Sequence, residues 1–199
     1  QLGFLSLANI NDYLSNKIKG HENTYQRRMQ DRADQMINIE TQIGPIYMSY
    51  PKNDKINKLL LNYTKTDPNY DFESFDTSRH KLWCISNKPD IQIISENLKS
   101  IKLLYIADGH HRMGAMNIIA KKFRKNNINN NDFMIAAFPT NQSQIFDYNR
   151  VVKDLNGLSG NEFLENLKLN FNISTCSRPY KPNLKKNFGM YHHGKWYSL

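Results

Sequence analysis

Two continuous apolar runs, "IKLLYIA" over Ile101–Ala107 and "FMIAAFP" over Phe133–Pro139, constrain the fold of this chain most strongly. Each has the length of a strand, and runs of this kind are typical of central strands that are buried on both faces. Between them, Met113–Arg124 has the apolar spacing of an amphipathic helix. A strand, a helix and a second strand in this order predict an α/β protein with a mixed sheet, and α+β is the alternative.

The other segments continue this alternation of strands and helices. Further strands are predicted over Gly3–Ile10, Pro45–Tyr50 and Arg79–Ser86, and one more is predicted to end at Asn149 and Arg150. Helices are predicted over Thr24–Gln42 and Asp54–Lys65, and another is predicted to begin near Ser159 or Asn161. Asp90–Ser100 has a helical pattern, but its isoleucines leave the choice of helix open. The last residues predict a hairpin that turns at His193 and Gly194, and "NNINNND" (126–132) predicts a loop.

Length and composition limit the classes of function. A chain of 199 residues is expected to form a single domain. The net charge of +9 comes from basic residues spread along the chain, without a zinc-finger or RNA-binding signature, which argues against a nucleic-acid partner. No apolar run reaches the roughly 18 residues that a membrane span needs, so a cytoplasmic protein is expected. Cys84 and Cys176 are far apart and form no CxxC, and they are expected to be buried free thiols.

The stretch "ADGHHR" places Asp108, Gly109, His110, His111 and Arg112 between a predicted strand and a predicted helix. The first turn of a helix has unpaired N–H groups and a partial positive charge, which together favour a bound anion. Gly109 allows the backbone to approach a ligand, Arg112 can hold phosphate oxygens, and the two imidazoles can donate hydrogen bonds or transfer protons. Asp108 could hold Mg²⁺ or orient an imidazole. This stretch therefore predicts a phosphate-binding turn. The structural alternative is an ordinary turn in which Asp108 caps the helix and the histidines are exposed.

A second polar cluster, "KGHENT", precedes the predicted helix over Thr24–Gln42. Thr24 can cap this helix, whereas Glu22 is free to accept a proton from a substrate hydroxyl or to bind a metal. Arg28 and Arg32 are one turn apart and could hold a phosphate or a carboxylate. The structural alternative is a capped helix with a solvated face.

Three other positions have both a structural and a functional interpretation. Trp83 is expected in the core, and stacking on a base is its functional alternative. His80 and Trp83 flank the strand predicted there. Arg150 could make a second phosphate contact or an ordinary surface ion pair.

At "ADGHHR" the chain resembles the bacterial and archaeal family called domain of unknown function 1015. Four further stretches match that family's pattern in order. They are "IKGHENTYQRRMQDR" (Ile18–Arg32), "GPIYMSY" (Gly44–Tyr50), "HKLW" (His80–Trp83) and "YNRVVKDL" (Tyr148–Leu155). The chain departs from the pattern at Met113, where the family often has an aromatic residue, and at Arg28, where it usually has lysine. Family members are commonly longer, so the chain is expected to be the central part of a longer family domain.

That family looks related to the ParB/sulfiredoxin-like group, which includes kinases that phosphorylate free serine. The resemblance implies a ParB/sulfiredoxin-like fold and contacts of Asp108–Arg112 with nucleotide phosphates. It favours a phosphotransferase that uses ATP or ADP with Mg²⁺ and acts on a small hydroxylated metabolite such as serine. Its catalytic residues would be Glu22 as the base, Asp108 and His110. The alternative is a ParB-like nucleotide-binding regulator without turnover. A phosphotransferase needs a carboxylate near its phosphate cradle, so we expect the Glu22 carboxylate within about 10 Å of the Asp108 loop.

Overall fold

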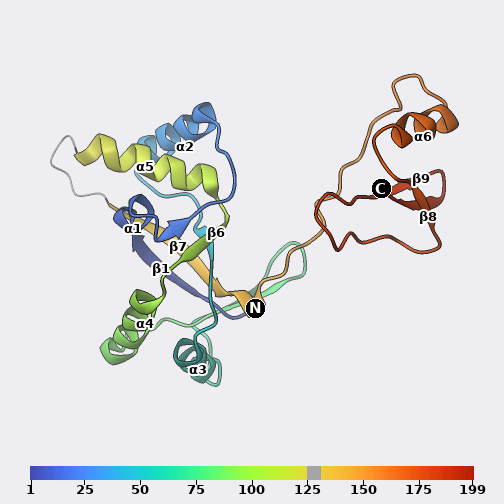
Figure 1. The fold of residues 1–199 in the computed structure, drawn as a ribbon. Coiled ribbons are helices and arrows are strands. Elements are labelled where there is room, and N and C mark those ends of the chain that lie inside the picture. The colour runs from blue at the N-terminus through green and yellow to red at the C-terminus, as the bar shows by residue number, and fades with distance from the viewer. Residues whose placement is uncertain (125–130) are drawn as a thin grey trace. The chain divides into compact units, whose positions relative to one another are not determined.

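The computed structural model describes residues 1–124 and 131–199, which form two compact units, Gln1–Ile145 and Phe146–Leu199 (Figure 1). Most of the loop predicted over 126–132 lies outside the described residues. In the described part of the chain, no helix combines the length and the apolar character that crossing a membrane requires.

The first unit is built on a five-stranded sheet in the order β1-β7-β3-β6-β2. Its strands are β1 (Phe4–Asn9), β2 (Ile18–Lys19), β3 (Ile46–Tyr50), β6 (Leu104–Asp108) and β7 (Asp132–Pro139). The pairs β7–β3 and β6–β2 are parallel, whereas β1–β7 and β3–β6 are antiparallel. The sheet is therefore mixed, and with its helices it confirms the predicted α/β class.

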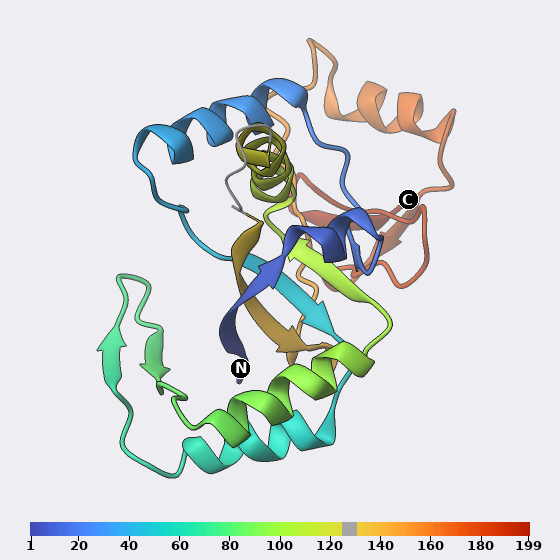
Figure 2. The same cartoon turned by 90° about the vertical axis from the view of Figure 1, so that its left-hand side faces the viewer.

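Two pairs of helices pack in this unit. The helices α2 (Gln26–Asn38) and α5 (His110–Arg124) contact each other, as do α3 (Asp54–Tyr63) and α4 (Lys88–Ser100). Figures 1 and 2 show the α2–α5 pair and the α3–α4 pair separated from each other, with the strands between them. A short helix, α1 (Ile10–Leu14), follows β1. The core combines alternate residues of the strands with the inner faces of these helices, including Ile46, Met48, Ile106, Met113 and Phe133.

The predicted strand over Ile101–Ala107 is buried on one face only. Leu104 and Ile106 of β6 are buried, but Tyr105 is 44% exposed and Ala107 is also exposed. On one side β6 pairs with β2, which has only two residues and therefore extends the sheet very little. The expectation of burial on both faces is therefore wrong for β6. β7 alternates between buried and half-buried residues and is a central strand, as predicted.

Local signals predicted some helix ends and missed others. The α3 helix is capped by Asn53, whose side chain accepts from the amides of Lys55 and Ile56. The predicted cap Thr24 is wrong. The α2 helix begins at Gln26, so Tyr25 occupies the cap position, and no side chain caps the helix. The α5 helix begins at His110, three residues before the predicted start, so the two histidines and Arg112 lie in its first turn.

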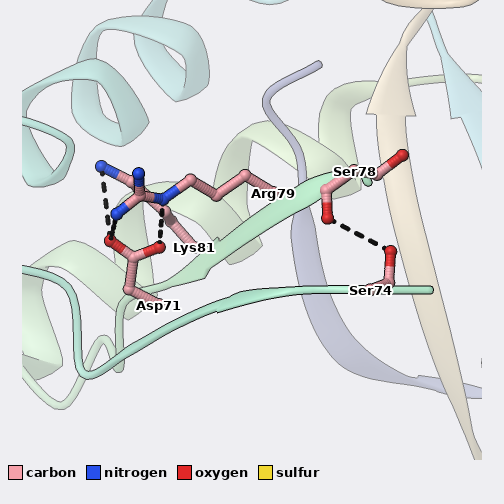
Figure 3. Close-up of polar contacts among 5 residues, drawn as sticks. All are labelled: Asp71, Ser74, Ser78, Arg79 and Lys81. Atoms are coloured by element: carbon pink, nitrogen blue, oxygen red, sulfur yellow. Dashed lines mark hydrogen bonds and ion pairs between the residues drawn. The ribbon is translucent and has the colours of Figure 1, made fainter. Parts of the chain in front are cut away.

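The segment after α3 forms a separate two-stranded hairpin of β4 (Tyr70–Glu73) and β5 (Arg79–Leu82). Asp71 joins the two strands. It accepts from Nε of Arg79 at 2.7 Å and from Nη2 at 2.9 Å, and Nζ of Lys81 lies 3.6 Å away (Figure 3). This arrangement lowers the pKa of Asp71, chiefly through the hydrogen bonds from Arg79. At the turn, the hydroxyl of Ser74 lies 3.1 Å from the carbonyl of Ser78 (Figure 3).

Two further expectations, on Trp83 and on the burial of the two cysteines, fail. Trp83 is half-buried rather than in the core, and its indole N–H donates to the carbonyl of Thr66. Cys84 is exposed and Cys176 is half-buried, so both thiols are free, as predicted, but neither is buried.

The second unit contains α6 (Gly160–Lys168) and a three-stranded sheet of β8 (Ser174–Cys176), β9 (Gly189–His192) and β10 (Lys195–Ser198). Ser159 caps α6 in a capping box with Glu162, as one of the two predicted caps. The hairpin predicted at His193 and Gly194 joins β9 to β10, and both turn residues have positive φ angles. Asn149 and Arg150 have no regular secondary structure, so the strand predicted to end there is wrong.

The contact between α2 and α5 depends on Gly114. A Cβ atom at this position would lie 2.1 Å from Sδ and 2.7 Å from Cγ of Met29. We expect Gly114→Ala to lower the free energy of unfolding by about 1–3 kcal/mol, because overpacking outweighs the better helix propensity of alanine. Urea denaturation measures this change. The double variant with Met29→Ala is the control and should recover part of the loss; equal losses in both variants would contradict the proposed clash.

Candidate functional site

The site is formed where the parallel strands β2 and β6 end. Ile18 pairs with Leu104 and Lys19 pairs with Tyr105. Because parallel strands end at the same edge of a sheet, the residues after Lys19 lie beside those after Tyr105. This pairing brings "GHENT" next to "DGHHR", although the two stretches are far apart in sequence.

The turn between β6 and α5 has a backbone geometry that suits glycine. Gly109 has a φ angle of +99°, a region that residues with a side chain rarely adopt. Its carbonyl accepts from the amide of Met113 at 2.8 Å, which closes the first turn of α5. Since α5 begins immediately after Gly109, the amides of His110, His111 and Arg112 belong to the helix end where backbone donors lack helical partners.

His110 connects this turn to Glu22. Its ring is buried, and Nε2 accepts from the backbone N–H of His21 at 3.2 Å. Nδ1 lies 3.2 Å from Oε2 of Glu22, whose side chain is 53% exposed. The expected proximity of Glu22 to the Asp108 loop is therefore confirmed. A Cβ atom on Gly20 would lie 2.9 Å from Cδ2 of His110, so this close approach also depends on a residue without a side chain.

His111 makes a second connection to the same segment. Its Nε2 accepts from the backbone N–H of Tyr25 at 3.2 Å. The two rings are nearly parallel, with an interplanar angle of 9° and centroids 6.2 Å apart. His110 and His111 thus bind the two ends of residues 21–25, which fixes the Glu22 segment against the start of α5.

Arg112 is folded back over its own turn. Its Nη2 lies 2.5 Å from Oδ2 of Asp108, and its side chain is 26% exposed. A Cβ atom on Gly109 would lie 2.9 Å from its Nε, and one on Gly44 would lie 2.9 Å from its Nη1. The guanidinium is therefore held between two glycines, and Asp108, which is 73% exposed, neutralises part of its charge. The Asp108 cap of the structural alternative is not observed, because Asp108 lies in β6.

The other predicted anion-binding residues lie farther out or elsewhere. Arg28 lies over the ring of Tyr25, with its Cζ 5.3 Å from the centroid, and Arg32 is exposed on α2. Arg150 belongs to the second unit, where its Cζ lies 3.7 Å from the ring centroid of Tyr148. His80 contacts Ser74 and Phe72 within the hairpin.

The electrostatics of the site favour a neutral His110. Burial of the ring and the neighbouring charge of His21 lower its pKa, and His111 acts in the same direction. Glu22 and Asp108 offset part of this effect by raising the pKa. Within residues 1–124 and 131–199, no three His, Cys, Asp or Glu side chains gather in a way that could hold a metal ion. Asp108 is left as a single exposed carboxylate that could contribute one ligand.

A groove of about 1570 Å³ in the first unit does not include this site. Its lining comes from β1, α3, the β4–β5 hairpin and α4, with Leu5, Leu7 and Trp83 among its apolar residues. We place the candidate site at the Asp108 loop, where the charged and polar side chains of Glu22, His110, Asp108 and Arg112 come together.

Sequence reasoning missed three residues of the site. His21 and Tyr25 take part through their backbone amides, which carry no residue-specific signal. Gly44 adjoins Arg112 through the pairing of the following strand, β3, with β6, and that pairing is not visible in the sequence.

Comparison with known proteins identifies a family but no individual relative. Neither the comparison with curated proteins nor that with solved structures found a match. A family model described as "Protein of unknown function (DUF1015)" matches residues 1–199, which includes both compact units and every residue of the candidate site. The chain belongs to the DUF1015 family.

Proposed function

We propose that this protein is a nucleotide-dependent phosphotransferase that acts on a small hydroxylated metabolite such as free serine. The observation that carries the proposal is the position of the Glu22 carboxylate, which is half-exposed to solvent and lies 3.2 Å from the ring Nδ1 of His110, the first residue of α5. A carboxylate next to the amide end of a helix places a proton acceptor beside an anion-binding position. Phosphoryl transfer needs these two groups close together.

In this proposal the helix end and Arg112 hold the phosphates. The amides at the start of α5 and the guanidinium of Arg112 would neutralise phosphate charge. Mg²⁺ usually keeps several waters and is held by one or two carboxylates together with the phosphates, and the exposed Asp108 fits that role. Arg28 and Arg32 would contact the outer phosphates or the acceptor's carboxylate. A contact of Arg150 with phosphate remains a proposal.

The chemical step assigns Glu22 as the base. The acceptor hydroxyl oxygen forms a bond to the terminal phosphorus of ATP or ADP, and the bond to the bridging oxygen breaks. The hydroxyl proton goes to Glu22, and the shortened nucleotide leaves with the electron pair of the broken bond. Glu22 suits this role because half of its side chain remains open to an incoming substrate.

The experiment is incubation of the purified chain with ATP or ADP, Mg²⁺ and a panel of hydroxylated amino acids, followed by ³¹P NMR. A phosphorylated amino acid supports the proposal. Nucleotide binding by calorimetry without any product favours the ParB-like regulator instead, and no nucleotide binding rejects both. The proposed kinship with ParB/sulfiredoxin-like proteins would be tested by comparing an experimental structure with theirs.

Arg112→Ala is expected to weaken nucleotide binding by about 1.5–3 kcal/mol, the usual contribution of a charge-assisted hydrogen bond. The reason is the fixed position of the guanidinium at the start of α5, between Gly44 and Gly109. Isothermal titration calorimetry measures the affinity. Arg27→Ala removes an exposed arginine of α2 and is the matched control. Equal affinities of the folded Arg112→Ala variant and the parent chain would reject the phosphate-binding role of this loop.

A further inference from the structure

His110 is buried with contacts at both ring nitrogens. Only 6% of the residue is exposed, and Nε2 accepts a hydrogen bond from the backbone N–H of His21. A neutral imidazole has one donor and one acceptor nitrogen, so a ring whose Nε2 accepts must carry its proton on Nδ1. Nδ1, which carries the proton, lies 3.2 Å from Oε2 of Glu22, within ion-pair distance. The backbone contact therefore makes the nitrogen beside the carboxylate the protonated one.

A ring in this state is poorly placed to exchange protons with a substrate. Its acceptor nitrogen is occupied by an amide of the protein, and its donor nitrogen faces a carboxylate of the protein. Glu22, in contrast, is half-exposed. The sequence made His110 a candidate for proton transfer, but the geometry assigns the two residues different tasks.

We propose that His110 is a positioning residue, held as the Nδ1–H tautomer by the amide of His21, that orients the Glu22 carboxylate toward the acceptor hydroxyl. This inference rests on the proposed function for the role of Glu22, but the tautomer and the contact can be tested without it. His110 acts on the reaction through Glu22 and touches no reacting atom.

The first test is long-range ¹H–¹⁵N NMR of the six histidines, with the His110 signals assigned by their loss in His110→Asn. The expected result is a protonated Nδ1 and an unprotonated Nε2 at pH 7. A proton on Nε2 at pH 7 would overturn the proposal, whether or not the protein turns out to be a kinase.

The second test compares two replacements that each preserve one nitrogen. The amide nitrogen of Asn occupies about the position of Nδ1, and that of Gln reaches about the position of Nε2. We expect His110→Gln to lower kcat by about tenfold or more, with the affinity for nucleotide unchanged within about twofold. His110→Asn keeps a donor toward Glu22 and should recover part of kcat. Equal losses of kcat in the two folded variants, or a loss of nucleotide affinity instead, would overturn the positioning role. Absence of turnover in the parent chain rejects the proposed function, and the NMR result then decides this proposal.

Discussion

Glu22→Gln should lower the rate of phosphoryl transfer by about 10²-fold or more while nucleotide affinity stays within about twofold. Glutamine has nearly the shape of glutamate but cannot accept the hydroxyl proton. The contact with His110 places this side chain at the start of α5, so its loss of basicity acts where the acceptor is expected to bind. Steady-state kinetics with ³¹P detection measures the rate, and calorimetry measures the affinity.

The matched control for this variant is Glu73→Gln, which removes an exposed carboxylate at the end of β4. Glu73→Gln changes the net charge by the same amount as Glu22→Gln. Because Glu73 lies in the β4–β5 hairpin and not in the candidate site, turnover should be unchanged. If Glu22→Gln and Glu73→Gln turn over at the same rate as the parent chain, Glu22 is not the base.

Gly109→Val should abolish measurable nucleotide binding and leave most of the fold intact. Two causes act together. A φ angle of +99° is strained for any residue with a side chain, at a cost of about 1–3 kcal/mol, and the new Cβ would lie 2.9 Å from Nε and 3.0 Å from Nη2 of Arg112. Valine would therefore displace both the turn and the guanidinium that is proposed to hold phosphate. Calorimetry measures binding, and circular dichroism reports whether the helices and sheet remain.

Gly157→Val is a control that separates backbone strain from steric clash. Gly157 also has a positive φ angle, of +79°, but a Cβ atom there would meet nothing within 4 Å, and it lies in the second unit. We expect this variant to lose some stability and to bind nucleotide normally. Normal binding by Gly109→Val would show that the backbone at this turn does not approach the ligand.

Most elements of the fold could be predicted because their signals are local. The pair Ser159 and Glu162 forms a capping box from residues three apart, and His193 and Gly194 adopt the turn that their types favour. Periodicity placed α3 correctly, whereas the isoleucines of α4 left its type open. These features depend on neighbours in sequence, which a single chain displays directly.

The features that sequence reasoning missed depend on partners distant in the chain. The exposure of Tyr105 follows from the short neighbour β2, and the half-burial of Trp83 follows from the position of the hairpin. The start of α2 after Tyr25 is associated with a contact to His111, 86 residues away. The proximity of Glu22 could be anticipated only from the chemistry that a phosphotransferase requires. The two residue pairs between β2 and β6 that bring Glu22 close to the loop have no signature in the sequence.

The short pairing of β2 with β6 also sets when the site can exist during synthesis. The contact of Tyr25 with His111 joins residues 86 positions apart, and at 5–20 residues per second the ribosome needs about 4–17 s to make that interval. Until β6 and the start of α5 have emerged, residues 18–25 have no strand to pair with and no imidazoles to bind. A nascent chain that ends before His110 therefore presents Glu22 on a free segment. If the protein binds nucleotide as proposed, that binding can stabilise the growing protein only after this point.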